Sequence, residues 1–224
     1  MLKRWKNILL NKKLTNLNIS NIYVIPTSVE LNKNKKIYTI QDPIKFTHLG
    51  ALGSRYDFHM YLKIMSKILK QRNIFLSIIN KGEHKKINDL IKEYNINSEK
   101  YEVKYVPPYS INDEIKNSNF GIFFPVNGFY LNAYFPTKLG EFLSNGIPVI
   151  TSSINNHVNS IIKENRIGII IDDLENFNFE KFYKEINNLL NDKDISERCI
   201  NAAKKNFDIE IANKIYSKIY RSLK

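Results

Sequence analysis

The sequence predicts an α/β fold, a doubly wound, Rossmann-like parallel sheet with helices on both faces. Short β-branched runs alternate with stretches in which apolar residues recur three and four positions apart, which is typical of strands alternating with amphipathic helices. The 224 residues are enough for one well-buried α/β domain and a little more. The predicted strands are residues 44–50, 74–80, 101–106, 120–125, 147–152 and 167–171. The predicted helices are residues 57–71, 84–95, 110–118, 136–145 and 156–165 between strands, then 178–191, 194–206 and 208–223.

The segment 132–151 joins a loop, a short helix and a buried strand. Pro136 suits the first helical turn, where a missing N–H costs nothing, and Leu139 and Phe142 have the spacing of a core-facing stripe. Gly146 ends the helix, and the Ile-Pro-Val-Ile run after it is typical of a strand covered on both faces. The helix therefore begins in a loop at the carboxyl end of a strand, where open α/β sheets bind ligands.

The start of this helix has the features of an anion site. Its free N–H groups and the positive end of its dipole favour an anion, and Lys138 adds a full charge beside them, so a diphosphate would fit. Glu141, one turn further on, can accept two hydrogen bonds from a vicinal diol such as a ribose. The alternative is an exposed Lys138–Glu141 pair that only complements the dipole. The spacing alone does not separate the two interpretations.

The loop after the first predicted strand contains a second candidate phosphate contact. Gly50 and Gly53 let the backbone come close to a ligand, and Arg55 supplies a planar fork for a phosphate. The alternative is a plain strand-to-helix turn with a solvated arginine, since the GxGxxG pattern of dinucleotide sites is absent.

Two segments carry a family resemblance. Residues 136–150 resemble the proline, serine or threonine, lysine, acidic residue and glycine-x-proline-valine segment of group 1 glycosyltransferases of the GT-B fold. These enzymes transfer a sugar from a nucleotide diphosphate donor. Residues 46–56 resemble the first strand and glycine-rich loop of their carboxyl-terminal, donor-binding domain, above all in a subgroup that acts on bacterial surface polysaccharides.

The resemblance implies roles for individual residues. Glu141 would hold the donor ribose, and the residues around Thr137 and Lys138 would face the donor phosphates. Many members carry a second glutamate eight positions before the first, and Ala133 stands there, which leaves open how the donor sugar is held.

Two further loops are candidates for the same pocket. Val106, Pro107 and Tyr109 lie at the level where GT-B enzymes seat the base, although a rigid proline turn explains them equally well. Asn155 and Asn156 either hydrogen-bond a sugar or phosphate or cap the following helix.

The resemblance also implies a domain organisation. Residues 19–30 resemble the segment that leads out of the amino-terminal domain, so the acceptor-binding half and the residue that assists the chemistry would lie in a domain of which this chain holds only the end. The chain would then be either a truncated product or one that works with a separately encoded amino-terminal domain as its partner. The basic, apolar start of the chain has an alternative interpretation, an amphipathic helix on a membrane surface. The predicted parts are 1–29 (remnant or amphipathic segment), 30–43 (linker), 44–207 (nucleotide-sugar-binding domain) and 208–224 (terminal helix).

Composition narrows the functional classes. The formal net charge is +12, but the lysines are scattered and no nucleic-acid motif accompanies them, so nucleic-acid binding is not favoured. The single cysteine, Cys199, forms no internal disulfide and indicates a reducing compartment. The four histidines have no metal-ligand spacing, so no metal and no cofactor are expected. No apolar run is long enough to span a membrane.

The sequence therefore predicts the donor-binding half of a cytoplasmic glycosyltransferase, with peripheral contact at the inner membrane face as an option. Its substrates would be a nucleotide-sugar donor and a glycan or lipid-linked acceptor in surface polysaccharide synthesis. The alternative is a non-catalytic subunit that binds a nucleotide sugar in a regulatory or assembly role.

Overall fold

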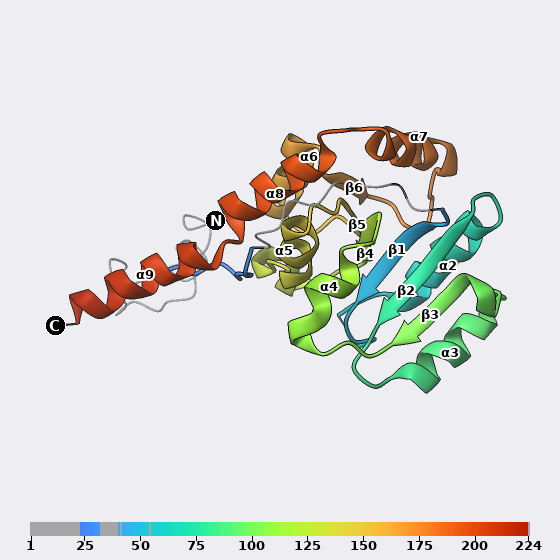
Figure 1. The fold of residues 1–224 in the computed structure, drawn as a ribbon, viewed down its shortest axis with the longest axis horizontal. Helices are drawn as coiled ribbons and strands as arrows, with labels where there is room; N and C mark the ends of the chain where they lie inside the picture. The colour runs from blue at the N-terminus through green and yellow to red at the C-terminus, as the bar shows by residue number, and fades with distance from the viewer. Residues whose placement is uncertain (1–22, 32–39, 41, 54, 224) are drawn as a thin grey trace.

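A computed structural model describes residues 23–31, 40, 42–53 and 55–223. Its sheet is entirely parallel, with six strands in the order β3-β2-β1-β4-β5-β6 (Figure 1). The doubly wound α/β prediction is confirmed, and every strand ends within two residues of its predicted bounds. The strands are β1 (Ile44–Leu49), β2 (Ile74–Ile79), β3 (Tyr101–Lys104), β4 (Phe120–Phe123), β5 (Val149–Ser152) and β6 (Gly168–Ile171).

The helices also follow the predicted order. Pro136 is the residue before α5 and has an extended backbone, so it lies just outside the first turn in which it was predicted. The described α-helices are α2 (Phe58–Leu69), α3 (His84–Glu93), α4 (Ile111–Ile115), α5 (Thr137–Ser144), α6 (Asn156–Asn165), α7 (Phe179–Leu190), α8 (Ile195–Asn206) and α9 (Ile209–Ser222).

The strand order reverses at the centre of the sheet, between β1 and β4. Phe46 pairs with Phe120 there, and Thr47 with Gly121. The chain winds outward from this point in both directions, and right-handed crossovers then place the helices on opposite faces. Figure 1 shows α2 and α3 on one side and α4 and α5 on the other. The loops after β1 and β4 therefore meet at the carboxyl edge, at the switch point where such sheets bind ligands.

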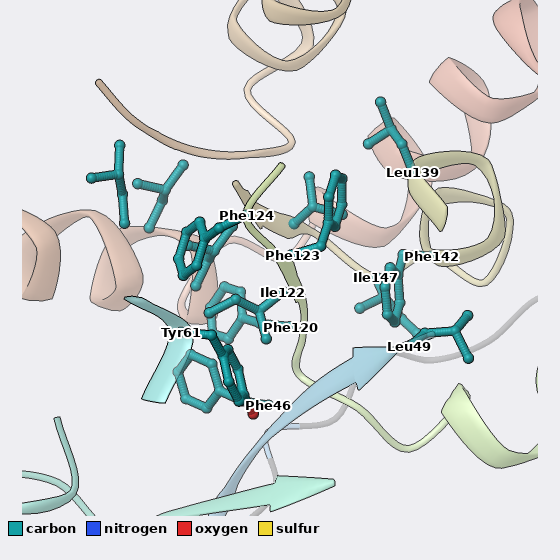
Figure 2. Packing of buried hydrophobic residues seen from close by; sticks show 14 of the residues in the cluster. Phe46, Leu49, Tyr61, Phe120, Ile122, Phe123, Phe124, Leu139, Phe142 and Ile147 are labelled. Atoms are coloured by element: carbon teal, nitrogen blue, oxygen red, sulfur yellow. The ribbon is translucent and has the colours of Figure 1, made fainter. Parts of the chain in front are cut away.

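The core lies on both faces of β4, because successive side chains of a strand point in opposite directions. Figure 2 shows Phe120, Ile122 and Phe124 on the side of Tyr61, and Phe123 on the other side. All five of these side chains are almost completely buried. Because β4 is buried on both faces, it gives rigid support to the loops at the switch point.

Helix α5 is fixed by close contacts on two sides. The ring of Phe142 lies against Gly121 of β4, where any side chain on the glycine would occupy the space of the ring. On its other side Gly140 gives room to Phe207, at the end of α8. The helix ends at Ser144, and Gly146, two residues later, turns the chain with a φ of +71° that glycine adopts without strain. These contacts fix where the first turn of α5 points.

The described residues before β1 contact the junction between α8 and α9. Val29 forms a bridge with Asp208, and its backbone bonds to Phe207 and Ile209 on either side. The remnant predicted over 1–29 and the linker over 30–43 lie mostly outside the described residues, so the domain boundaries remain predictions. No helix among the described residues is both long enough and apolar enough to cross a membrane.

Helix α9 extends away from the rest of the domain (Figure 1). The apolar residues at 211, 212, 215, 216 and 219 share one face, of which only Ala212 is buried, while Tyr216 and Tyr220 stack on each other in an exposed position.

Candidate functional site

A cavity of ≈ 630 Å³ opens at the switch point, between the loops after β1 and β4 and the start of α5. It brings together four of the predicted site residues, Arg55, Thr137, Lys138 and Glu141. The remaining lining residues are Thr27, Leu49, Gly50, Tyr56, Ile111, Ala133, Tyr134 and Phe135.

The ammonium group of Lys138 is buried at the wall of this cavity. Its Nζ has no hydrogen-bond partner among the described residues and lies over the ring of Tyr56, 3.4 Å from the ring centroid. The backbone of Gly50, with a φ of +124°, leaves the space that the ammonium occupies. Burial lowers the pKa of Lys138 to about 7, although the nearby Glu141 carboxylate acts in the opposite direction. The alternative of an exposed Lys138–Glu141 pair is therefore wrong.

Glu141 lies one helical turn after Lys138 and lines the same cavity. Burial raises the pKa of its carboxyl group, and the charge of Lys138 partly offsets this. The cavity is thus lined by a cation, Lys138, and by a hydrogen-bond acceptor, Glu141. A ligand with an anionic part and a vicinal diol would match this arrangement.

Three tyrosines join the loop after β1 to the loop after β4. The hydroxyl groups of Tyr56 and Tyr134 are 2.5 Å apart and share a hydrogen bond. Tyr130 shares its one hydroxyl proton between the carbonyl oxygen of Val126, at 2.7 Å, and that of Arg55, at 3.2 Å. These bonds fix the position of the Arg55 backbone and hold the Tyr56 ring over Lys138.

Sequence reasoning missed Tyr56 and Tyr134 as parts of the site. The available signal was that aromatic residues follow β1 and β4, two strands whose carboxyl ends meet at the switch point. Burial raises the pKa of both phenol groups, so both hydroxyls stay protonated and neutral near pH 7.

His48 lies in the core beneath Tyr56. Its Nδ1–H donates to the carbonyl oxygen of Ile122 at 3.3 Å, and its Nε2 has no partner among the residues that the structure describes. Burial, together with the charge of Lys138, lowers its pKa to about 3. The imidazole is therefore neutral near pH 7 and adds no positive charge beside Lys138.

The other predicted contacts do not line this cavity. Gly53, Val106 and Pro107 are not among its lining residues, and the side chain of Tyr109 is 87% exposed. Their roles in phosphate and base binding remain predictions.

Asn155 has a structural role, as one of its two predicted interpretations required. Its side chain caps α6 by accepting a bond from Val158 N, and it donates to the carbonyl oxygens of Leu131 and Tyr134. The structure thus supports the capping interpretation and makes Asn155 a support for the Tyr134 loop.

Ala133 lines the cavity, where its methyl group offers no hydrogen bond. Within the described ranges, no three His, Cys, Asp or Glu side chains come together in a way that could hold a metal ion. The prediction that no metal takes part is not tested by this finding.

Comparisons with solved structures support the fold. The chain resembles a mutant of S. aureus TarM in complex with fondaparinux, alpha-GlcNAc-glycerol and UDP (TM-score 0.66, 15% identity, 92% of this chain and 41% of that one). It also resembles the lipopolysaccharide outer core galactosyltransferase WaaB (0.64, 16%, 93% and 58%) and Anabaena HepE in complex with UDP-glucose (0.61, 12%, 80% and 49%). At these identities the likeness concerns the GT-B glycosyltransferase fold. The chain spans between 41% and 58% of the length of these proteins.

Comparison with curated proteins found no match. The model of the family described as glycosyl transferases group 1, however, matches residues 30–206, which include the whole sheet, α5 and every residue lining the cavity except Thr27. This match covers well over half of the chain, and the fold is that of the neighbours. The chain therefore belongs to the group 1 glycosyltransferase family.

Proposed function

We propose that this chain is the donor-binding half of a glycosyltransferase that transfers a sugar from a nucleoside diphosphate sugar to a glycan or lipid-linked acceptor in surface polysaccharide synthesis. Family membership supports the reaction class. The structures of TarM and HepE contain UDP and UDP-glucose respectively, which makes a uridine nucleotide the first donor to test.

The observation that carries this proposal is the unpartnered Lys138 ammonium. It lies at the wall of a cavity, at the amino-terminal turn of α5, where free N–H groups and the helix dipole also favour an anion. Arg55 reaches the same cavity from the loop after β1. A diphosphate between them would supply the partner that Lys138 lacks.

These groups would act on the leaving nucleotide. Negative charge develops on the diphosphate as the sugar departs, and Arg55, Lys138 and the first amides of α5 would stabilise that charge. Glu141 would hold the ribose and so fix the position of the sugar carbon that reacts. The acceptor and the residue that assists its attack would come from an amino-terminal domain.

A calorimetric titration with UDP, GDP and ADP tests the proposal. One nucleotide is expected to bind saturably, and Glu141→Ala is expected to weaken its binding by about 1 to 3 kcal/mol, because a buried carboxylate that accepts the ribose hydroxyls is lost. Glu164→Ala, which removes an exposed carboxylate on α6, is the matched control and should bind like the wild type. Equal affinities of the two variants would contradict the role of Glu141.

A second candidate is a non-catalytic subunit that binds a nucleotide sugar. Ala133 favours it, because the cavity lacks a carboxylate where many family members carry one. Co-expression with a matching amino-terminal domain separates the two candidates. Sugar transfer by the co-purified pair would support the enzyme, whereas nucleotide binding without transfer would support the subunit.

The proposed function also implies a location in the cell. A single, buried cysteine agrees with a reducing, cytoplasmic compartment, where a lipid-linked acceptor would bring the protein to the inner membrane face. Fractionation of cells into soluble and membrane parts tests this location.

A further inference from the structure

The side chain of Lys138 is in an unusual environment for a lysine. Its Nζ is shielded from solvent and has no hydrogen-bond partner in the described part of the chain, although an ammonium group has three N–H donors. The Tyr56 ring faces it at 3.4 Å, and a cation–π contact of this kind replaces only part of the lost hydration. The ammonium is therefore costly to keep charged while the cavity contains no anion.

We propose that Lys138 takes up a proton when an anion enters the cavity, and that Tyr56 and Gly50 are the positioning residues that keep its side chain without a polar partner until then. This inference rests on the proposed function for the identity of the anion, a nucleoside diphosphate. The proton uptake itself is inferred from the packing around the Lys138 amine.

The groups around Lys138 come from β1, from the loops after β1 and β4, and from α5. His48 of β1 is neutral, and the hydroxyls of Tyr56 and Tyr134 are protonated. Among charged groups, Glu141 of α5 favours the ammonium, while Arg55 lines the same cavity and is a like charge. Burial outweighs Glu141, and the pKa of Lys138 falls to about 7. Near neutral pH the amine and the ammonium are then both populated.

The proton balance follows directly. The amine nitrogen takes a proton from the buffer, and the ammonium donates it in a hydrogen bond to a phosphate oxygen. A bound diphosphate favours the charged form and returns the lysine pKa towards its ordinary range of about 10. With a pKa of about 7 in the empty cavity, uptake is expected to be about 0.5 proton per bound ligand at pH 7 and about 1 at pH 8.5.

Calorimetric titration with UDP in buffers of different ionisation enthalpy measures this number. At pH 8.5 the terminal phosphate of UDP is fully ionised, since its second pKa is near 6, so the ligand itself contributes no proton. The slope of observed enthalpy against buffer ionisation enthalpy gives the protons taken up. Wild-type affinity is also expected to fall roughly 15-fold from pH 7 to pH 8.5, because the charged fraction of Lys138 falls by that factor.

Lys138→Arg provides the sharpest variant. A guanidinium stays charged throughout this range, so proton uptake is expected to vanish and the affinity for UDP to become independent of pH. Lys138→Met is the second variant, should the larger arginine disturb the fold, and it is expected to abolish the uptake and weaken binding. Lys163→Arg, on the exposed end of α6, is the matched control and should retain the wild-type proton count.

Two variants of Tyr56 test its positioning role. Tyr56→Phe keeps the ring over Lys138 and loses the hydroxyl, whereas Tyr56→Leu loses the ring. Because Tyr56→Phe also loses the bond to Tyr134 that holds the ring, the midpoint of the pH dependence should move less in the first variant than in the second. An unchanged midpoint in Tyr56→Leu would overturn the positioning role.

The outcomes are distinguishable from those of the proposed function. Binding of UDP with the same enthalpy in every buffer at pH 8.5 would overturn the inference and leave the proposed function standing. Failure of UDP to bind at either pH would instead count against UDP as the ligand. Nitrogen-15 NMR of the lysines in the ligand-free chain decides the matter independently of any ligand, because a Lys138 that titrates near pH 10 overturns the inference.

Discussion

Replacing Lys138 with methionine is expected to stabilise the fold, by on the order of 3 kcal/mol at pH 6, while it weakens nucleotide binding. Methionine fills a similar space and needs no hydrogen bonds, whereas the lysine is charged at pH 6 and has no polar partner. Lower stability together with tighter nucleotide binding would show that Lys138 serves the function of the protein and not its stability.

The pH dependence of this effect has a definite sign. The pKa of Lys138 is lowered in the folded chain, so its destabilising effect is complete below about pH 7 and disappears as the pH rises towards the unfolded value near 10.4. Between these values the unfolded chain binds a proton that the folded chain does not, and the wild type gains stability with rising pH. Urea unfolding at pH 6 and pH 9.5 should show the advantage of the variant shrinking.

Lys163→Met is the control, because that side chain is exposed, and its effect should stay within about 0.5 kcal/mol at both pH values. If Lys138→Met instead destabilised the chain at pH 6 by more than this control, the ammonium would have polar partners that this account denies.

Phe142→Ala is expected to destabilise the chain by about 3 to 5 kcal/mol, since it empties a fully buried site between α5 and β4. Gly121→Ala is expected to cost about 1 to 3 kcal/mol, because its new methyl group would occupy the space of the Phe142 ring. Urea unfolding of both variants measures these values, and Phe129→Ala, at a side chain 75% exposed, should change stability by less than about 0.5 kcal/mol.

The double variant is the decisive member of this set. Once the Phe142 ring is removed, the methyl group at position 121 fills part of the cavity that it left, so the double variant should lose less stability than the sum of the single ones. A coupling of about 0.5 to 3 kcal/mol in this direction is expected. Strict additivity would mean that the ring does not rest on Gly121, and the seating of α5 would need another explanation.

The strands could be predicted closely because each is a short apolar run in a sheet covered on both faces. The largest differences are of two residues: β3 and β4 end two residues early, and β5 begins two residues late. β3 ends at Lys104, with Pro107 and Pro108 following shortly afterwards. Proline cannot donate to a ladder, which agrees with an early end. Pro136 precedes α5 for a related reason, since its extended backbone belongs to the loop.

The site could be predicted in part. Arg55, Lys138 and Glu141 come together because the topology brings the loop after β1 to the start of α5, and that follows from the order of strands and helices. The burial of Lys138 could not be predicted, because it depends on the Tyr56 ring. That ring is held by a hydroxyl contact to Tyr134, across 78 positions of sequence.

The structure of the chain with UDP bound is the most direct test, because the same edge of the sheet has a second cavity of nearly equal size. That cavity, of ≈ 620 Å³, is lined by carboxylates including Asp57, Asp172 and Asp173. The account predicts the diphosphate within hydrogen-bond distance of Lys138 Nζ and the ribose at Glu141. A UDP molecule bound in the acidic cavity, with Lys138 still beneath Tyr56 and without a partner, would contradict it.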